Sequence, residues 1–226
     1  FLNFFINHGL FKLRNRPQWY TVSNRSRIYV EKVLKNISGE VFKNYKVESI
    51  KRNSDNVRIN VNGEFLDYDE VILASHADQS LNLLEDPTDE EKKILGKFCY
   101  ISNKIFLHTD EKLMPKRKVA WSSWNSLSKE NNSCVTYWLN KLQNLDCEPN
   151  YFLSLNPVSE IDNKKIIHKT YFTHPYFNSE TLMAQKDLKL LQGKKRTWYC
   201  GSYFGYGFHE DGLKSTLDLI QNFKTS

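Results

Sequence analysis

The chain has 226 residues, of which 40% are hydrophobic, enough for one large domain or two small ones around a core. Its 32 basic and 26 acidic residues leave a net charge of +6, which is too mild and too evenly mixed for a nucleic-acid-binding protein. No apolar run reaches the length of a membrane span, and the four cysteines show neither a C-x-x-C pair nor a metal-ligand spacing.

The first third of the chain alternates helix and strand signals. The aromatic-rich opening, residues 1–13, is a truncated core helix, an interfacial anchor or the wall of a lipid-sized pocket. Residues 26–37 have apolar side chains at helical spacing and end at Gly39. Three strands follow, the last two joined by an Asn-Gly turn: residues 45–50, 57–61 and 64–68. Residues 69–75 are a short apolar run, typical of a strand buried on both faces of a parallel sheet.

The middle of the chain predicts a mixed α/β region with a largely antiparallel sheet. Thr88 and Glu91 have the spacing of a capping box at the start of a helix. Strand signals then recur at short intervals, over residues 100–108, 118–125, 133–139, 151–155 and 165–172. A helical stretch over residues 180–191 closes this region.

The C-terminal segment, residues 196–220, is the most informative. It predicts a buried strand over residues 197–200, a loop, and a helix that begins near Asp211. Four of the nine glycines fall within residues 201–212. A glycine-rich turn at a helix N-terminus lets backbone N–H groups approach a phosphate, a ribityl chain or an electron-rich ring edge.

This segment resembles the C-terminal flavin motif of the flavin-containing amine oxidase and phytoene desaturase superfamily. It is most similar to a subgroup of predicted NAD/FAD-binding proteins associated with cyclopropane-fatty-acid synthases. In the family, the strand ends in Gly-Glu or Gly-Asp, whereas Gly201-Ser202 lacks the acidic residue. The same resemblance rests on further motifs: Arg16-Pro-Gln-Trp-Tyr-Thr-Val, Leu107-His-Thr-Asp, Met114-Pro, Ala120-Trp-Ser-Ser-Trp-Asn, Thr136-Tyr-Trp-Leu-Asn and Leu155-Asn-Pro.

The resemblance implies FAD as the cofactor and a partial, discontinuous FAD-binding domain. No Gly-x-Gly-x-x-Gly occurs in the sequence, so we interpret the chain as the C-terminal part of a longer flavoprotein. We expect an FAD-binding domain over residues 26–76 and 186–226, a substrate domain over 77–185, and a remnant of the substrate domain over 1–25. These residues alone should purify colourless or poorly soluble.

The resemblance also implies the residues of the site. Lys104, on a predicted strand, matches the lysine that contacts flavin N5 through water, although Asn103 fits almost as well. His209 is the candidate proton donor at the flavin edge, and Asp211 the cap of the last helix. In the resembled loop, His76 stands in place of a proline. The expected cofactor contacts are Val47, Ala74, Ser75, Gly201, Ser202, Gly205, Gly207, Phe208, His209, Glu210, Asp211 and Gly212.

Four aromatic residues are candidates for the wall of an apolar substrate pocket: Trp121, Trp124, Tyr137 and Trp138. We predict an FAD-dependent oxidoreductase that transfers a hydride from an apolar substrate, first a lipid acyl chain and second an amine, with no metal and no nucleic acid. The alternative is a flavin-less lipid- or partner-binding module. With no visible signal peptide, a cytoplasmic location is the default, and the basic clusters leave a peripheral contact with the inner face of the membrane open.

Overall fold

The computed structural model describes residues 25–130 and 132–223, together with residues 6, 9, 11–15, 18, 20, 22 and 23. The predictions for the aromatic opening and for the motif at residues 16–22 fall mostly on residues outside this set. In the described part, the chain is mixed α/β, with antiparallel sheets and one parallel strand pair, which confirms the predicted fold class.

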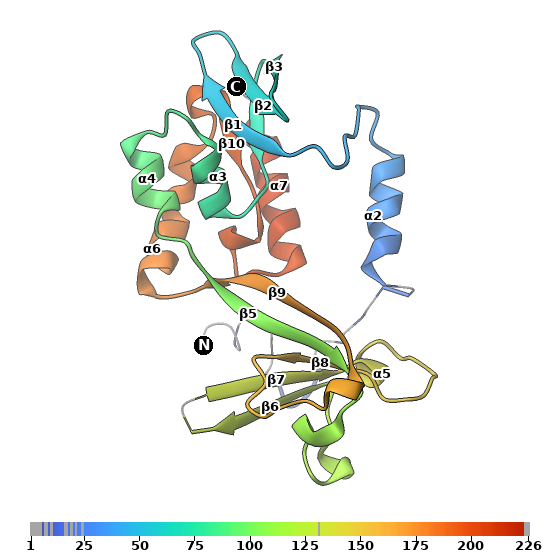
Figure 1. Cartoon of the computed structure of the whole chain (residues 1–226). Helices are drawn as coiled ribbons and strands as arrows, with labels where there is room; N and C mark the ends of the chain where they lie inside the picture. Colours follow the sequence, from blue (N-terminus) through green and yellow to red (C-terminus); the bar gives the residue numbers. More distant parts are fainter. Residues whose placement is uncertain are drawn as a thin grey trace.

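Two short parallel strands, β4 (Val71–Leu73) and β10 (Thr197–Tyr199), lie at the centre of the upper part of Figure 1, which we call the helical end. Four helices surround them: α3 (Ala77–Leu83), α4 (Asp89–Leu95), α6 (Ser179–Asp187) and α7 (His209–Phe223). The predicted capping box is present, since Thr88 Oγ1 accepts the Glu91 N–H and the Glu91 carboxylate accepts the Thr88 N–H. The largest core cluster brings together buried residues from β4, β10 and helices α3, α4 and α6.

A three-stranded antiparallel sheet, β1 (Val47–Arg52), β2 (Val57–Val61) and β3 (Glu64–Tyr68), stands at the top of the helical end. The turn between β2 and β3 places Asn62 at φ 52° and Gly63 at φ 85°, as a tight hairpin turn requires. Helix α2 (Ser26–Lys35) is joined to β1 by a long connection and buries none of its residues (Figure 1).

The lower part, the sheet end, is one antiparallel sheet in the order β6-β7-β8-β5-β9. Its strands are β5 (Cys99–His108), β6 (Trp124–Lys129), β7 (Asn132–Trp138), β8 (Phe152–Leu155) and β9 (Ile166–Tyr176), with the short helix α5 (Leu139–Leu142) after β7. The long pair β5 and β9 runs from this sheet up to the helical end, so one ribbon joins the two parts (Figure 1).

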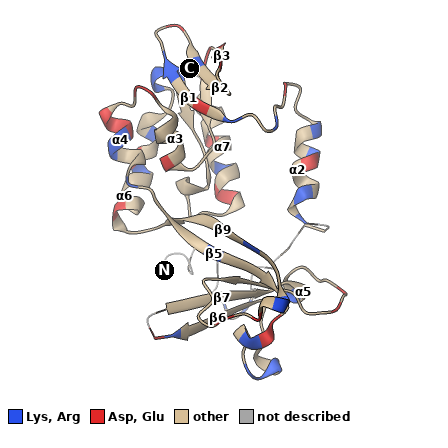
Figure 2. Ribbon diagram, viewed as in Figure 1, with Lys and Arg blue, Asp and Glu red and all other residues tan. Residues whose placement is uncertain are grey.

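Six short 3-10 turns complete the described chain: Glu111–Leu113, Lys118–Ala120, Asn163–Lys165, Leu188–Leu191, Lys194–Arg196 and Ser202–Phe204. Basic and acidic residues are interspersed along the elements of both ends (Figure 2). Residues 77–95, assigned from the sequence to the substrate domain, pack in the same core as β4 and β10. The division into domains stays a prediction.

Two local predictions are wrong. The strand expected over residues 118–125 is a 3-10 turn over Lys118–Ala120, and β6 begins only at Trp124. The strand expected to be buried on both faces is buried on one, since Val71 and Leu73 are buried while Ile72 is 50% exposed. Ile72 alternates with Val71 and Leu73, so it points away from the core that those two residues enter.

Candidate functional site

Two loops meet at the carboxyl ends of the parallel strands. Tyr199 pairs with Leu73, and the Cys200 N–H donates to the Leu73 carbonyl over 3.1 Å. Because both strands run in the same direction, the residues that follow them, Ala74-Ser75 and Gly201-Ser202, emerge at one edge. A Cβ atom at Gly201 would lie 3.8 Å from the Ser75 carbonyl oxygen. In open α/β sheets this edge is where ligands bind.

Three of the glycines in the loop after β10 are needed for its shape. Gly201 has φ 151°, and a Cβ atom there would lie 2.8 Å from Cε1 of Tyr203. A Cβ atom at Gly205 would lie 2.2 Å from Oδ1 of Asp211, well inside van der Waals contact. Gly207 has φ 92°, a conformation that side-chain-bearing residues rarely adopt. The loop therefore needs glycine at three of its seven positions between residues 201 and 207.

Asp211 orders the loop from within the first turn of α7. Its Oδ2 atom accepts the N–H groups of Tyr206 over 3.0 Å and Phe208 over 2.9 Å. Helix α7 begins at His209, two residues before the predicted start, and continues for 15 residues. Glu210 and Asp211 place negative charge at the positive end of its dipole.

Side chains that the sequence did not single out hold the same loop from outside. Gln185 of α6 donates to the carbonyls of Tyr203 over 3.0 Å and Gly205 over 2.6 Å. Ser215 of α7 accepts the Gly201 N–H over 2.9 Å and donates to the carbonyl of Gly212. No sequence signal marks these residues, since each reaches its partner only through tertiary packing.

His209 lies on the exposed first turn of α7 and contacts a distant element. Its Nδ1 atom is 2.8 Å from the hydroxyl of Tyr29 on α2, and the two rings meet edge to face at 6.0 Å. A hydrogen bond at Nδ1 orients the imidazole and leaves Nε2 as its other proton-carrying position. Tyr29 therefore positions the candidate proton donor, a role that the sequence did not predict.

The flavin implied by the sequence fits this edge. The turn from Gly201 to Gly207, the adjoining Ala74-Ser75 loop and the N-terminus of a long helix together supply backbone groups and the positive end of a helix dipole, which suit the polar edge of a flavin ring. A Cβ atom at Gly212 would lie in van der Waals contact with the Ser202 nitrogen at 3.8 Å, so the first turn of α7 packs against the start of the glycine turn. Gly201, Ser202 and the Ala74-Ser75 loop are the residues that would hold the ring.

The predicted adenine contact, Val47, begins β1. A register shift between Val47 and Ser49 turns the Val47 side chain toward the core of the helical end. Its backbone therefore lies at the border between the three-stranded sheet and that core.

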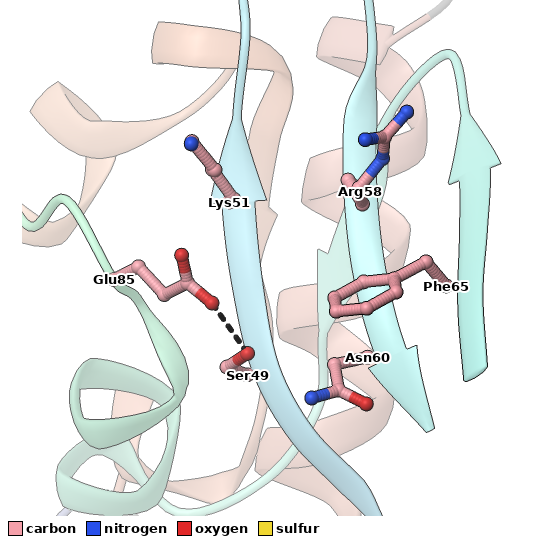
Figure 3. Close-up of a pocket in the computed structure, with 6 residues that line it drawn as sticks. All are labelled: Ser49, Lys51, Arg58, Asn60, Phe65 and Glu85. Carbon is pink, nitrogen blue, oxygen red and sulfur yellow. Dashed lines mark hydrogen bonds between the residues drawn. The ribbon is translucent and has the colours of Figure 1, made fainter. Parts of the chain in front are cut away.

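A cavity of about 310 Å³ lies on the other face of the three-stranded sheet (Figure 3). Figure 3 shows Ser49 and Lys51 from β1, Arg58 and Asn60 from β2, Phe65 from β3 and Glu85 from the loop between α3 and α4. The Ser49 hydroxyl donates to Glu85 over 2.6 Å. None of the predicted cofactor contacts lines this cavity.

A larger cavity, of about 1190 Å³, opens at the sheet end and includes Lys104. Lys104 is exposed on β5, and its N–H donates to the Asn156 side-chain oxygen over 2.9 Å. Asn103, the alternative to Lys104, points to the opposite face of the sheet and contacts Nδ1 of His174 over 2.9 Å. Of the two neighbours, Lys104 is the one that lines the cavity.

Lys104 lies on the face of β5 that reaches the cofactor loops. Tyr100, four residues earlier on the same face, stacks on His76 at 4.2 Å and accepts the Ala77 N–H over 3.0 Å. Burial raises the pKa of Tyr100 to about 12, so it stays a neutral anchor at physiological pH.

The four aromatic residues predicted to line one pocket are split between two faces of the sheet. Trp121 is 7% exposed and packs edge to face on Trp138 at 5.2 Å, within a core cluster. Trp124 pairs directly with Tyr137 on the other face and is 59% exposed. None of the four lines either cavity described above. They do not come together as one wall.

A buried ionic network supports the base of the site. Arg52 donates to both carboxylate oxygens of Glu91, and the side chains are 0% and 3% exposed. Glu91 also accepts the Tyr199 hydroxyl over 2.6 Å. Burial alone would raise the pKa of Glu91, but the hydrogen bonds from Arg52 and Tyr199 outweigh it and lower that pKa. The carboxylate therefore stays charged and ties β1, α4 and β10 together.

Within the described residues, no three His, Cys, Asp or Glu side chains gather closely enough to hold a metal ion. None of the helices in the same part of the chain combines the length and the apolar character that a membrane crossing requires.

The comparisons with known proteins agree with this geometry. A family model described as flavin containing amine oxidoreductase matches residues 29–145. A CLA-producing fatty acid isomerase from P. acnes aligns with a TM-score of 0.63 at 15% identity, over 88% of this chain and 52% of that one. Putrescine oxidase bound to putrescine aligns with a TM-score of 0.62 at 9% identity, over 90% and 54%.

Cyclohexylamine oxidase from Brevibacterium oxydans IH-35A aligns with a TM-score of 0.52 at 8% identity, over 79% of this chain and 48% of that one. The chain thus spans about half the length of these structures. No curated protein matches it.

Proposed function

The chain belongs to the flavin-containing amine oxidoreductase family, whose cofactor is FAD, and from this premise we propose that it forms part of an FAD-dependent oxidoreductase acting on an apolar substrate. The observation that carries the proposal is the meeting of the Ala74-Ser75 loop with the Gly201 turn at the carboxyl ends of β4 and β10. The preferred substrate is a lipid acyl chain, with which the fatty acid isomerase neighbour is compatible, and an amine is the second choice.

Each residue of the site would have a separate role in binding or in proton transfer. FAD, when bound, supplies the acceptor for a hydride equivalent from the substrate. Gly201, Ser202 and the Ala74-Ser75 loop bind and orient the ring. His209, held at Nδ1 by Tyr29, presents a proton at Nε2. Lys104, on the face of β5 that also carries Tyr100, holds a water or a polar substrate group on the side of the cavity.

A flavin-less lipid-binding module remains the second candidate because of one observation. The larger cavity is lined entirely by residues of the sheet end and by none of the glycine turn. A ligand could therefore occupy it without the cofactor.

Purification of the protein from its full open reading frame tests the two candidates. The oxidoreductase predicts a visible flavin absorbance band that bleaches on addition of dithionite. Gly205→Ala should remove or weaken the band, because the new Cβ displaces Asp211, while Gly39→Ala, with nothing within 4 Å of its Cβ, is the matched control. A folded, colourless protein that does not respond to added FAD would refute the oxidoreductase and leave the binding module.

A further inference from the structure

Four side chains form an alternating pattern of charge and aromatic surface on the strand pair β5–β9. Lys104 lies directly opposite Tyr171, and Phe106 lies directly opposite Lys169. Directly opposite residues share a sheet face, and diagonal neighbours such as Lys104 and Lys169 are typically about 7–8 Å apart. All four line the cavity of about 1190 Å³. Two cations and two rings therefore face one ligand space.

The charge of this space is positive. Neither Lys104 nor Lys169 has a carboxylate within ion-pair distance among the residues described, and Glu160 is the one acidic residue in the cavity lining. The Lys169 ammonium lies 5.4 Å from the ring centroid of Phe106, so its charge sits directly beside apolar surface. An anion bound there would meet a cation and a hydrophobic wall together.

The apolar part of the cavity is anchored in a core cluster. Val158, Ile161 and Ile166 line the cavity and also pack, with Phe106, around buried Leu113. Such a surface suits a hydrocarbon chain, because each methylene that leaves water contributes about 0.8 kcal/mol.

The segment that forms the cavity wall is fixed to β5 by Asn156, from the Leu-Asn-Pro motif. Asn156 has φ 48°, its side-chain oxygen accepts the Lys104 N–H over 2.9 Å, and its own N–H donates to the Lys104 carbonyl over 2.9 Å. Its amide group also donates to the Asn103 side chain over 2.7 Å. Backbone and side chain together hold the segment at one place on the strand, so the cavity is preformed.

We propose that this cavity binds an amphipathic anion, with its charged end at Lys169 and its hydrocarbon chain along Phe106 and the apolar wall of Val158, Ile161 and Ile166. The inference that this ligand is the substrate rests on the proposed function, because the same ligand would be the one that is oxidised or isomerised. The inference that such a ligand binds here rests on the cavity alone. The carboxylate of a fatty acid and the phosphate of a phospholipid share the required chemistry.

Titration of the protein with chain-matched amphiphiles tests the site. Tridecanoate, dodecyl phosphate and dodecanol each carry a dodecyl chain, so only the head group differs. We expect both anions to bind at least about tenfold more tightly than the alcohol, the equivalent of about 1.4 kcal/mol, and this preference to shrink as salt is raised. The anion that binds more tightly identifies the carboxylate or the phosphate as the natural head group.

Substitutions test whether Lys169 is responsible for the preference for anions over the alcohol. Lys169→Met should abolish the roughly tenfold preference for anions while leaving dodecanol binding in place, because the hydrocarbon wall is kept. Lys169→Arg should retain the preference, and Lys116→Met, an exposed lysine outside the cavity lining, should leave it unchanged. Circular dichroism and thermal unfolding of each variant check that the fold is intact.

Equal binding of the alcohol and the anions would overturn the inference, as would an unchanged preference in Lys169→Met. A flavin-containing protein that ignores all three amphiphiles refutes this site and leaves the oxidoreductase standing. Anion binding by a folded protein that takes up no flavin supports this site and refutes the oxidoreductase.

Discussion

The candidate ligand surfaces at the two ends of the molecule consist of different groups, backbone at one end and side chains at the other. At the helical end, the candidate cofactor edge is made of backbone: bare glycines, two strand ends and a helix N-terminus, with Asp211 folded back onto the turn. At the sheet end, the cavity is made of side chains that project from neighbouring strands, such as Lys104 and Lys169. Backbone surfaces tolerate few substitutions, because they depend on the absence of a Cβ atom, whereas side-chain surfaces can change their chemistry one residue at a time.

The supports beneath the two surfaces differ as well. The helical end rests on the ionic contact between Arg52 and Glu91, while the sheet end contains a neutral buried chain of hydroxyl and imidazole groups. His108 Nδ1 accepts the Asp110 N–H, so Nε2 carries the proton that is donated to Ser154 over 2.8 Å, and Ser154 in turn contacts Thr136 over 2.7 Å. One support depends on charge and the other on remaining uncharged.

The largest effect that we expect comes from breaking the ionic support. Glu91→Ala leaves the Arg52 guanidinium buried without its main partner, which should lower the free energy of unfolding by about 3–5 kcal/mol. Denaturant unfolding followed by circular dichroism measures this change. Asp67→Ala, which removes the exposed partner of Arg58, is the control and should have little effect. Similar losses in both variants would show that the buried pair has no special role.

A smaller effect should follow from adding one carbon to the glycine turn. In Gly205→Ala the new Cβ overlaps Asp211, and the resulting shift should cost about 1–3 kcal/mol of stability as well as flavin binding. Differential scanning calorimetry compares this variant with Gly39→Ala, whose Cβ meets open space. If the two variants unfold at the same temperature, the turn is not held as tightly as its contacts indicate.

The smallest effect is a pH dependence specific to the sheet end. Burial lowers the pKa of His108 below its ordinary value of 6.5, although nearby Asp110 opposes this. The unfolded chain therefore takes up this proton more readily, so the stability that the neutral ring provides is fully present above pH 6.5 and is lost as the pH falls below it.

Unfolding measured between about pH 5 and 7 should show this slope in the parent protein and a weaker slope in His108→Gln, which keeps a neutral donor toward Ser154. The exposed His174→Gln should leave the slope due to His108 in place. An identical slope in His108→Gln would assign the acid sensitivity to other groups.

The sequence by itself determined the features that depend on neighbouring residues. The capping box at Thr88 and Glu91 and the Asn62-Gly63 hairpin turn formed as expected, and so did the strand, glycine turn and helix of residues 197–223. The capping box, the hairpin turn and the Asp211 contacts at the start of the last helix join residues a few positions apart, which is why a local pattern suffices to predict them. The family resemblance rests on the same kind of local motif, and the family match over residues 29–145 confirms it.

Only the tertiary structure decided which distant side chains share a surface. Strand register pairs Trp124 with Tyr137 on one face of the sheet, whereas Trp138 faces the other side and meets Trp121 from the loop before β6, although all four lie within 18 residues of sequence. Packing brought Tyr29 to His209 across 180 positions. Because side chains alternate faces along a strand, a shift of one residue exchanges every contact, and the pattern of a single segment does not determine which strand will lie beside it.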